Sequence, residues 1–182
     1  ADVKVTGEKE EIEAADRIIL PGVGAFADAK EKLDQTGLVE TILEQTTDGK
    51  PLLGICLGMQ LLFEKSYEYG EHDGLGLIKG NIKPIENIIP KDYKIPHIGW
   101  NRLTLNKEKE ISPIYKYIKN GDYVYFVHSY YGAECDEYVT ARAEYGAMLT
   151  ASVQNKNVYG TQFHPEKSGR VGLDILRAFC EI

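Results

Sequence analysis

The segment Gly54-Ile55-Cys56-Leu57-Gly58 constrains the fold of this chain more than any other. The apolar run 51–55 predicts a short buried strand, and residues 59–65 predict a helix. A strand that turns sharply into a helix, with a nucleophile at the turn, is the elbow of G-x-S-x-G enzymes; here sulfur replaces oxygen. Glycine is needed on both sides because other side chains would collide across the strained turn. The segment therefore predicts an α/β elbow that points Cys56 outward.

The surroundings of Cys56 bear on its reactivity. A free thiol, with a pKa near ~8.5, is only a few per cent thiolate at neutral pH. A helix that begins directly after the cysteine directs free N–H groups and a partial positive charge at the sulfur, which favours the thiolate. The motif alone leaves two interpretations open: a reactive nucleophile, or a buried structural cysteine between packing glycines.

Length and composition narrow the class of protein. A chain of 182 residues fits one domain with a substantial core. Its net charge of −7 argues against a nucleic-acid partner, since such proteins need a basic face. The three cysteines, Cys56, Cys135 and Cys180, are an odd number without paired spacing, which is typical of a reducing compartment. Because no apolar run approaches the ~18 residues of a membrane span, we expect a cytoplasmic protein without membrane contact, in which Cys135 and Cys180 are structural.

Strand and helix signals alternate in the first half of the chain. Residues 1–6 and 16–20 predict strands, and residues 25–46 predict helical structure with a break near Gly37. The second half changes to strands joined by turns and a closing helix, expected at 75–78, 93–105, 123–131, 139–144, 148–154, 158–163 and 172–182. We therefore expect one α/β domain over 1–182: a flavodoxin-like, open, mostly parallel sheet with helices on both faces and an antiparallel β extension.

His164 is the best-placed base for a cysteine nucleophile. It ends a predicted strand, and Pro165 keeps it extended rather than helical. Extended residues two apart point the same way, so Glu166 is expected beside the ring, where a carboxylate stabilises imidazolium. On its own, His-Pro-Glu is more typical of a surface turn, and the elbow is what favours the catalytic interpretation.

The turn Pro21-Gly22-Val23-Gly24 also ends a strand and precedes a helix. Such a turn can direct backbone N–H groups at a developing oxyanion, where one donor is worth ~3 kcal/mol. The rival interpretation is a dinucleotide-binding turn, because residues 22–27 fit G-x-G-x-x-A. The leading proline and the lack of an acidic residue about 20 positions later argue against it.

Metal binding is not expected. His72-Asp73 is a single local pair, and the remaining histidines lack the spacing of metal ligands. His128 lies in the aromatic strand 125–130, where a packed, hydrogen-bonded histidine is more common than a catalytic one.

Three motifs in this order resemble the class I, triad-type glutamine amidotransferases: Pro21-Gly22-Val23-Gly24, Gly54-Ile55-Cys56-Leu57-Gly58-Met59-Gln60 and Phe163-His164-Pro165-Glu166-Lys167-Ser168. With His97-Ile98-Gly99-Trp100-Asn101 and residues 125–130, the resemblance narrows to the glutaminase subunit of imidazole glycerol phosphate synthase, of histidine biosynthesis. It runs from Ala1 to Ile182. It implies a cofactor-free enzyme that hydrolyses glutamine and feeds ammonia to a cyclase subunit, a (β/α)8 barrel, as its heterodimer partner.

The resemblance also implies roles for single residues. Cys56 would be the nucleophile, His164 the acid and base, and Glu166 the group that orients His164. Val23 and Leu57 would supply oxyanion N–H groups. The remaining positions divide into a glutamine site (Gly24, Gln60, His128, Ser129 and Tyr130) and a cyclase interface (Trp100, Tyr125 and Lys167).

The resemblance leaves three alternatives and one expectation about the domain. Amidotransferases of anthranilate, purine or pyridoxal phosphate synthesis share the chemistry but pair with other synthases. A cysteine α/β-hydrolase would need its acid between the nucleophile and the histidine in chain order. A flavodoxin-like binding module would leave Cys56 without a role.

The family begins with a strand, a glycine-rich loop and a helix absent from this chain, so we expect a domain that lacks its N-terminal strand and helix.

Overall fold

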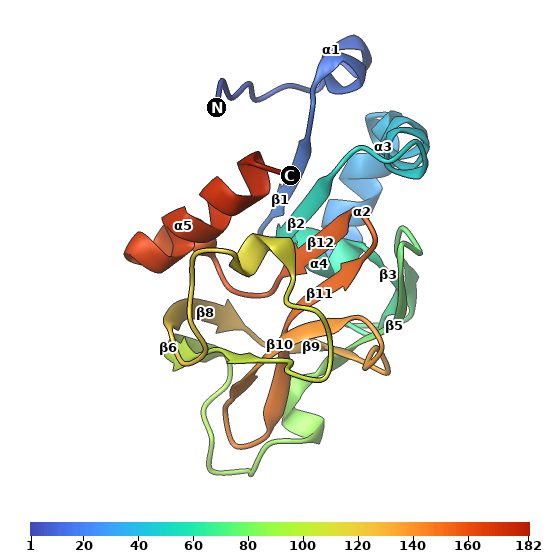
Figure 1. Ribbon diagram of the computed structural model, residues 1–182. Helices are drawn as coiled ribbons and strands as arrows, with labels where there is room; N and C mark the ends of the chain where they lie inside the picture. Colours follow the sequence, from blue (N-terminus) through green and yellow to red (C-terminus); the bar gives the residue numbers. More distant parts are fainter.

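A computed structural model describes all residues from 1 to 182. Its largest sheet has six strands in the order β1-β2-β12-β11-β10-β7 (Figure 1). The strands are β1 (Ile18–Gly22), β2 (Leu52–Cys56), β12 (Val158–Thr161), β11 (Met148–Asn155), β10 (Val139–Glu144) and β7 (Thr104–Leu105). β2 pairs in parallel with β1 and β12, whereas the pairs from β12 to β7 are antiparallel. The expected parallel core with an antiparallel extension is therefore confirmed.

Helices cover both faces of this sheet (Figure 1). They are α1 (Lys9–Ala14), α2 (Phe26–Gln35), α3 (Leu38–Thr47), α4 (Leu57–Leu61) and α5 (Gly169–Cys180). Successive residues of β2 show the division: Leu52 belongs to the core cluster that contains α3, and Leu53 to the cluster that contains α5. Because neighbouring strand residues point to opposite faces, an entirely apolar strand such as β2 must be buried on both.

Two smaller sheets complete the fold. One has the order β4-β3-β5-β9 and the other pairs β6 with β8. Their strands are β3 (Phe63–Ser66), β4 (His72–Asp73), β5 (Ile78–Pro84), β9 (Tyr130–Ala133), β6 (His97–Arg102) and β8 (Tyr123–His128). Three short 3-10 helices, η1 (Ile85–Asn87), η2 (Pro113–Tyr115) and η3 (Pro165–Lys167), lie between strands or before α5.

Three local predictions are wrong, and for two of them strand pairing is the reason. Residues 1–6 form no strand, and Val5 is 99% exposed, because no neighbouring strand pairs with them. The elbow helix ends at Leu61 rather than Lys65, because Phe63–Ser66 turns into a strand that pairs with β5. The strand expected at 75–78 begins only at Ile78.

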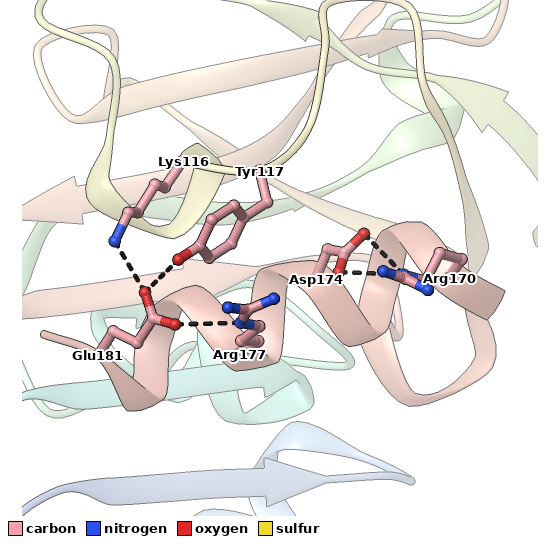
Figure 2. A network of polar contacts seen from close by, with 6 residues as sticks. All are labelled: Lys116, Tyr117, Arg170, Asp174, Arg177 and Glu181. Carbon is pink, nitrogen blue, oxygen red and sulfur yellow. Dashed lines mark hydrogen bonds and ion pairs between the residues drawn. The ribbon is translucent and has the colours of Figure 1, made fainter.

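Helix α5 is fixed against the η2 loop by burial and by a polar network (Figure 2). Glu181 accepts hydrogen bonds from Lys116 Nζ at 2.8 Å, Tyr117 Oη at 2.5 Å and Arg177 Nε at 3.0 Å. Exposed ion pairs of this kind contribute at most ~1 kcal/mol each. The buried Ile175 and Phe179 contribute more, because they share a core cluster with Ile114 and Tyr115 of η2.

Candidate functional site

Cys56 sits in a strained turn between β2 and α4. Its backbone has φ 54° and ψ −112°, a conformation that side-chain-bearing residues rarely adopt. The chain around it is too close for side chains: a Cβ on Gly58 would lie 1.8 Å from the Leu20 carbonyl oxygen, and one on Gly54 would lie 2.7 Å from the Gly58 oxygen. The predicted strained elbow is confirmed, and Cys56 is only 8% exposed, so its side chain does not lie in open solvent.

A cavity of about 590 Å³ opens over the elbow. It gathers residues from the ends of β1, β2, β8 and β12, which are far apart in the sequence. Of the predicted site residues, it is lined by Val23, Gly24, Cys56, Leu57, Gln60, His128, Ser129, Tyr130, His164 and Lys167. A larger hollow of about 720 Å³ runs along residues 37–48, but no cysteine or histidine lines it. The cavity at the elbow is therefore the candidate active site.

His164 reaches this cavity from the end of β12. Its backbone is extended (φ −97°, ψ 98°), as the following proline predicts. Its Nδ1 lies 2.7 Å from Oε1 of Glu166, so the carboxylate accepts the Nδ1 proton and leaves Nε2 as the free acceptor. His164 is 3% exposed, whereas the Glu166 side chain is 48% exposed. The predicted pairing of the two residues is confirmed, and the acid follows the histidine in the chain, unlike the order in α/β-hydrolases.

The electrostatics of the sulfur differ from the sequence expectation. Burial raises the pKa of the Cys56 thiol to about 11, although hydrogen bonds from the Leu57 backbone and the Gln162 side chain act in the opposite direction. Helix α4 has only five residues, so its partial charge is small beside the cost of removing a thiolate from water. The resting site therefore holds a protonated thiol.

His128 is packed and hydrogen-bonded, as its aromatic strand predicts. Its Nδ1 donates to the Tyr130 carbonyl at 2.7 Å, and its Nε2 lies 3.0 Å from Nδ1 of His97. His97 in turn lies 2.8 Å from Oδ1 of Asn101. Burial lowers the pKa of His128 to about 3, so this ring is neutral at pH 7. The chain of contacts holds residues 128–130 at the cavity wall.

Sequence reasoning missed two residues at this site. Gln162 lies two positions before His164 in the bend that follows β12, and its Nε2 is 3.8 Å from Cys56 Sγ. Strand alternation does not identify it, because the chain bends between Thr161 and His164. Glu68 lines the cavity and accepts the Phe26 backbone N–H through Oε2 at 2.5 Å. It lies in a loop after β3, where no periodic pattern points to it.

Two of the predicted interface residues lie outside the cavity. Trp100 on β6 and Tyr125 on β8 face each other across the strand pair, with ring centroids 6.0 Å apart. Trp100 is 52% exposed, and Ile98, two positions earlier on the same strand face, is 57% exposed. We call this exposed side of β6 and β8, which carries Ile98, Trp100, Tyr123 and Tyr125, the outer face. It borders the cavity at Val127.

Two kinds of feature, a metal-binding group and a membrane-spanning helix, are absent from the molecule. No group of three or more His, Cys, Asp or Glu side chains is arranged to hold a metal ion. None of the helices combines the length and the apolar character that crossing a lipid bilayer requires.

Comparison with known proteins identifies the family. The family described as "Glutamine amidotransferase class-I" matches residues 1–181. The protein named "Imidazole glycerol phosphate synthase subunit HisH" of Caldanaerobacter subterraneus is 53% identical over 184 residues, covering 100% of this chain and 86% of that protein. The protein of the same name from Aquifex aeolicus is 48% identical over 179 residues, covering 98% of this chain and 83% of its own length.

Solved structures agree on the fold. A glutamine amidotransferase crystal structure superposes with a TM-score of 0.74 at 20% identity, covering all of this chain and 86% of the other. The glutaminase domain of Trypanosoma brucei CTPS, with bound acivicin, gives a TM-score of 0.63 at 17% identity, covering 95% of this chain and 74% of the other. The chain therefore belongs to the class I glutamine amidotransferase family and, within it, to the HisH subunits.

Proposed function

We propose that this protein is the glutaminase subunit of imidazole glycerol phosphate synthase, with Cys56, His164 and Glu166 as its catalytic triad. One observation carries the proposal: a cysteine on a strained elbow and a carboxylate-paired histidine line the same cavity. The sequence identity of about half to HisH proteins supports the choice of this synthase over other amidotransferases.

The first half of the proposed reaction forms a thioester. With its pKa at about 11, the Cys56 thiol needs a nearby base, and Nε2 of His164 accepts its proton as the sulfur attacks the side-chain amide carbon of glutamine. The C–N bond then breaks, and His164 returns the proton to the departing nitrogen. Ammonia leaves, and a glutamyl thioester remains on Cys56.

The second half consumes water. His164 takes a proton from a water molecule, the resulting hydroxide attacks the thioester carbon, and the C–S bond breaks as His164 returns the proton to the sulfur. The products are glutamate and the free Cys56 thiol. In both halves Glu166 holds the Nδ1 proton in place and stabilises the imidazolium.

Backbone N–H groups would bind the oxyanion formed in each half. The N–H of Leu57 directly follows the nucleophile, and that of Val23 belongs to the turn after β1; both residues line the cavity. Gly24, with φ +96°, gives this turn a conformation that favours glycine. Each such donor is worth ~3 kcal/mol of transition-state stabilisation.

The rest of the cavity wall would bind the glutamine molecule itself. Gly24, Gln60, His128, Ser129 and Tyr130 provide amide, imidazole and backbone polar groups. Glu68 adds a carboxylate with one oxygen free of the Phe26 N–H, which suits the α-ammonium group of the substrate.

The partner in this proposal is a cyclase subunit, a (β/α)8 barrel, joined in a heterodimer with lyase activity in the cytoplasm. The outer face supports a docking role because it exposes large apolar side chains directly beside the cavity. Trp100, Tyr125 and Lys167 would contact the barrel, so ammonia could pass to the partner without entering bulk solvent.

One experiment tests the proposal directly. Ammonia release from glutamine is measured for this protein alone, with the cyclase, and with the cyclase and its nucleotide substrate. We expect release that depends on Cys56 and rises with the partner. Ester hydrolysis without glutamine turnover, or no association with a cyclase barrel, would contradict the proposal.

A further inference from the structure

We infer that Gln162 is a further catalytic residue, whose side-chain amide donates a hydrogen bond to the Cys56 sulfur, and that Gln60 positions this amide. The inference rests on the proposed function in one respect, namely that Cys56 is the nucleophile. It assigns a role to a residue that no sequence motif singled out, and it gives Gln60 a second role besides contact with glutamine.

The geometry forms a short relay of three side chains. Nε2 of Gln60 donates to Oε1 of Gln162 at 3.1 Å, and Nε2 of Gln162 donates to Sγ of Cys56 at 3.8 Å. Gln162 is fully buried, Gln60 is 6% exposed and Cys56 is 8% exposed. Because the Gln162 oxygen is engaged by Gln60, its NH₂ group is the end that faces the sulfur.

Local structure explains why these residues meet. Gln60 lies four positions after Cys56, which is one turn along α4. Gln162 is fixed by its backbone N–H, which donates to the Ala151 carbonyl at 2.9 Å. It lies in the bend that directly follows β12, two positions before His164. The residue that donates to the sulfur and the proposed base therefore come from one short segment at the end of β12.

The relay has an electrostatic consequence for the buried sulfur. A thiolate in this position loses contact with water, so protein donors must replace its hydration. The two donors present are the Leu57 backbone N–H and the Gln162 amide. A hydrogen bond to an anion is stronger than one to a neutral thiol, so the amide favours the ionised form that attacks the substrate.

Gln60 links this buried donor to the substrate space. It lines the cavity, whereas Gln162 does not. A group at residue 60 that accepts instead of donates would make the Gln162 amide rotate, so that its oxygen faced the sulfur. The hydrogen-bonding character of residue 60, at the cavity wall, therefore decides which end of the Gln162 amide faces the sulfur.

The test measures alkylation of Cys56 by iodoacetamide as a function of pH, read peptide by peptide with mass spectrometry. Removal of one hydrogen bond to a thiolate is expected to raise the alkylation midpoint by about one pH unit, and to lower the rate below the midpoint about tenfold, in Gln162→Leu. Gln162→Glu should raise the midpoint further and lower the rate further, because a carboxylate also repels the thiolate. Gln60→Glu should raise the midpoint as well, through rotation of the Gln162 amide and through the charge of the new carboxylate.

Controls separate this role from a structural one. Gln154→Leu removes a glutamine of β11 whose side chain donates one hydrogen bond, to the Lys156 carbonyl, and this variant should leave the midpoint unchanged. Alkylation of the exposed Cys180 checks the reagent in every sample. If Gln162→Leu fails to fold, which its melting curve would reveal, Gln162→Met, which also removes the donor without adding charge, decides the matter alone.

An unchanged Cys56 midpoint in a folded Gln162→Leu protein, or in Gln162→Met where that variant decides, overturns the inference. The readout needs no glutamine, so it does not depend on the proposed function. A shifted midpoint in a protein that releases no ammonia from glutamine would support the hydrogen bond and contradict the glutaminase. An unchanged midpoint in a protein that does release ammonia from glutamine would contradict the hydrogen bond and support the glutaminase.

Discussion

Strand β2, at the centre of the parallel core, and strand β6, in the β6–β8 pair, differ in how much of their side chains they expose. β2 is buried along its whole length, whereas β6 alternates between buried His97 and exposed residues such as Ile98 and Trp100. A strand covered on both faces holds its end rigidly, which suits a nucleophile that must keep a strained backbone. A strand covered on one face offers the other to a partner. The difference indicates that this domain separates a rigid reaction site from an adjoining docking surface.

The largest effect should come from the rigid site. We predict that Cys56→Ala lowers glutamine-dependent activity by about 10⁴-fold or more, because no nucleophile remains. Ammonia-dependent synthesis by the assembled enzyme should continue. The measurement is product formation with glutamine or with ammonium salts, and Cys135→Ala, also at a buried cysteine, is the control. Equal loss of both activities would mean that Cys56 holds the fold or the interface instead.

The elbow itself can be broken by one methyl group. Gly58→Ala should destabilise the domain by about 3 kcal/mol or more, because its Cβ would overlap the Leu20 carbonyl in a part of the core that cannot move. Urea unfolding measures the change. Gly7→Ala, where nothing lies within 4 Å, should leave stability nearly unchanged. Similar midpoints for the two variants would show that the elbow is not tightly packed.

In contrast to the elbow, a substitution on the docking surface should change partner binding rather than stability. We expect Trp100→Ala to weaken binding of the cyclase by about 10- to 100-fold, as for an aromatic residue at the centre of an interface, with little change in stability. Titration calorimetry and thermal melting measure the two quantities. Leu173→Ala is the matched control, because Leu173 is 59% exposed but lies on α5. Unchanged affinity in Trp100→Ala would place the interface elsewhere.

Glu166 is intermediate between the buried reaction site and the exposed docking surface, because its side chain is about half exposed. Glu166→Ala should lower glutaminase turnover by roughly 10- to 100-fold, less than Cys56→Ala, since water can replace part of the contact with His164 Nδ1. Glu166→Gln keeps an acceptor without the charge and should lose less. Steady-state kinetics distinguish the two variants. A loss as large as that of Cys56→Ala would show that the charge is indispensable.

The last prediction concerns stability in acid. The pKa of His128 falls from 6.5 to about 3 on folding, so below pH 6.5 the unfolded chain binds a proton that the folded one does not. Stability therefore decreases as the pH falls from 6.5 towards 3, by at most ~1.4 kcal/mol per pH unit for this group. His128→Gln should flatten that slope in urea unfolding. A slope equal to that of the unsubstituted protein would rule out this burial effect.

Much of the fold was predictable where a pattern is local. β10 falls at the predicted residues, and β1, β2 and the break at Gly37 lie close to them, because apolar runs and turn residues act within a few positions. The predictions of a strand at residues 1–6 and of a helix up to Lys65 were wrong. Strand formation depends on a neighbouring strand, and the sequence does not show which segments become neighbours. Phe63–Ser66 shows this most clearly, since helical propensity there yields to pairing with β5.

Sequence alone determined the elbow, the strand-end histidine with its carboxylate, and the family, because each depends on short motifs with strict steric or chemical demands. Tertiary structure decided the rest: that burial keeps the Cys56 thiol protonated, that Gln162 and Glu68 join the site, and that β6 and β8 leave one face open. These outcomes depend on which distant segments exclude water from each group, and no spacing along the chain encodes that.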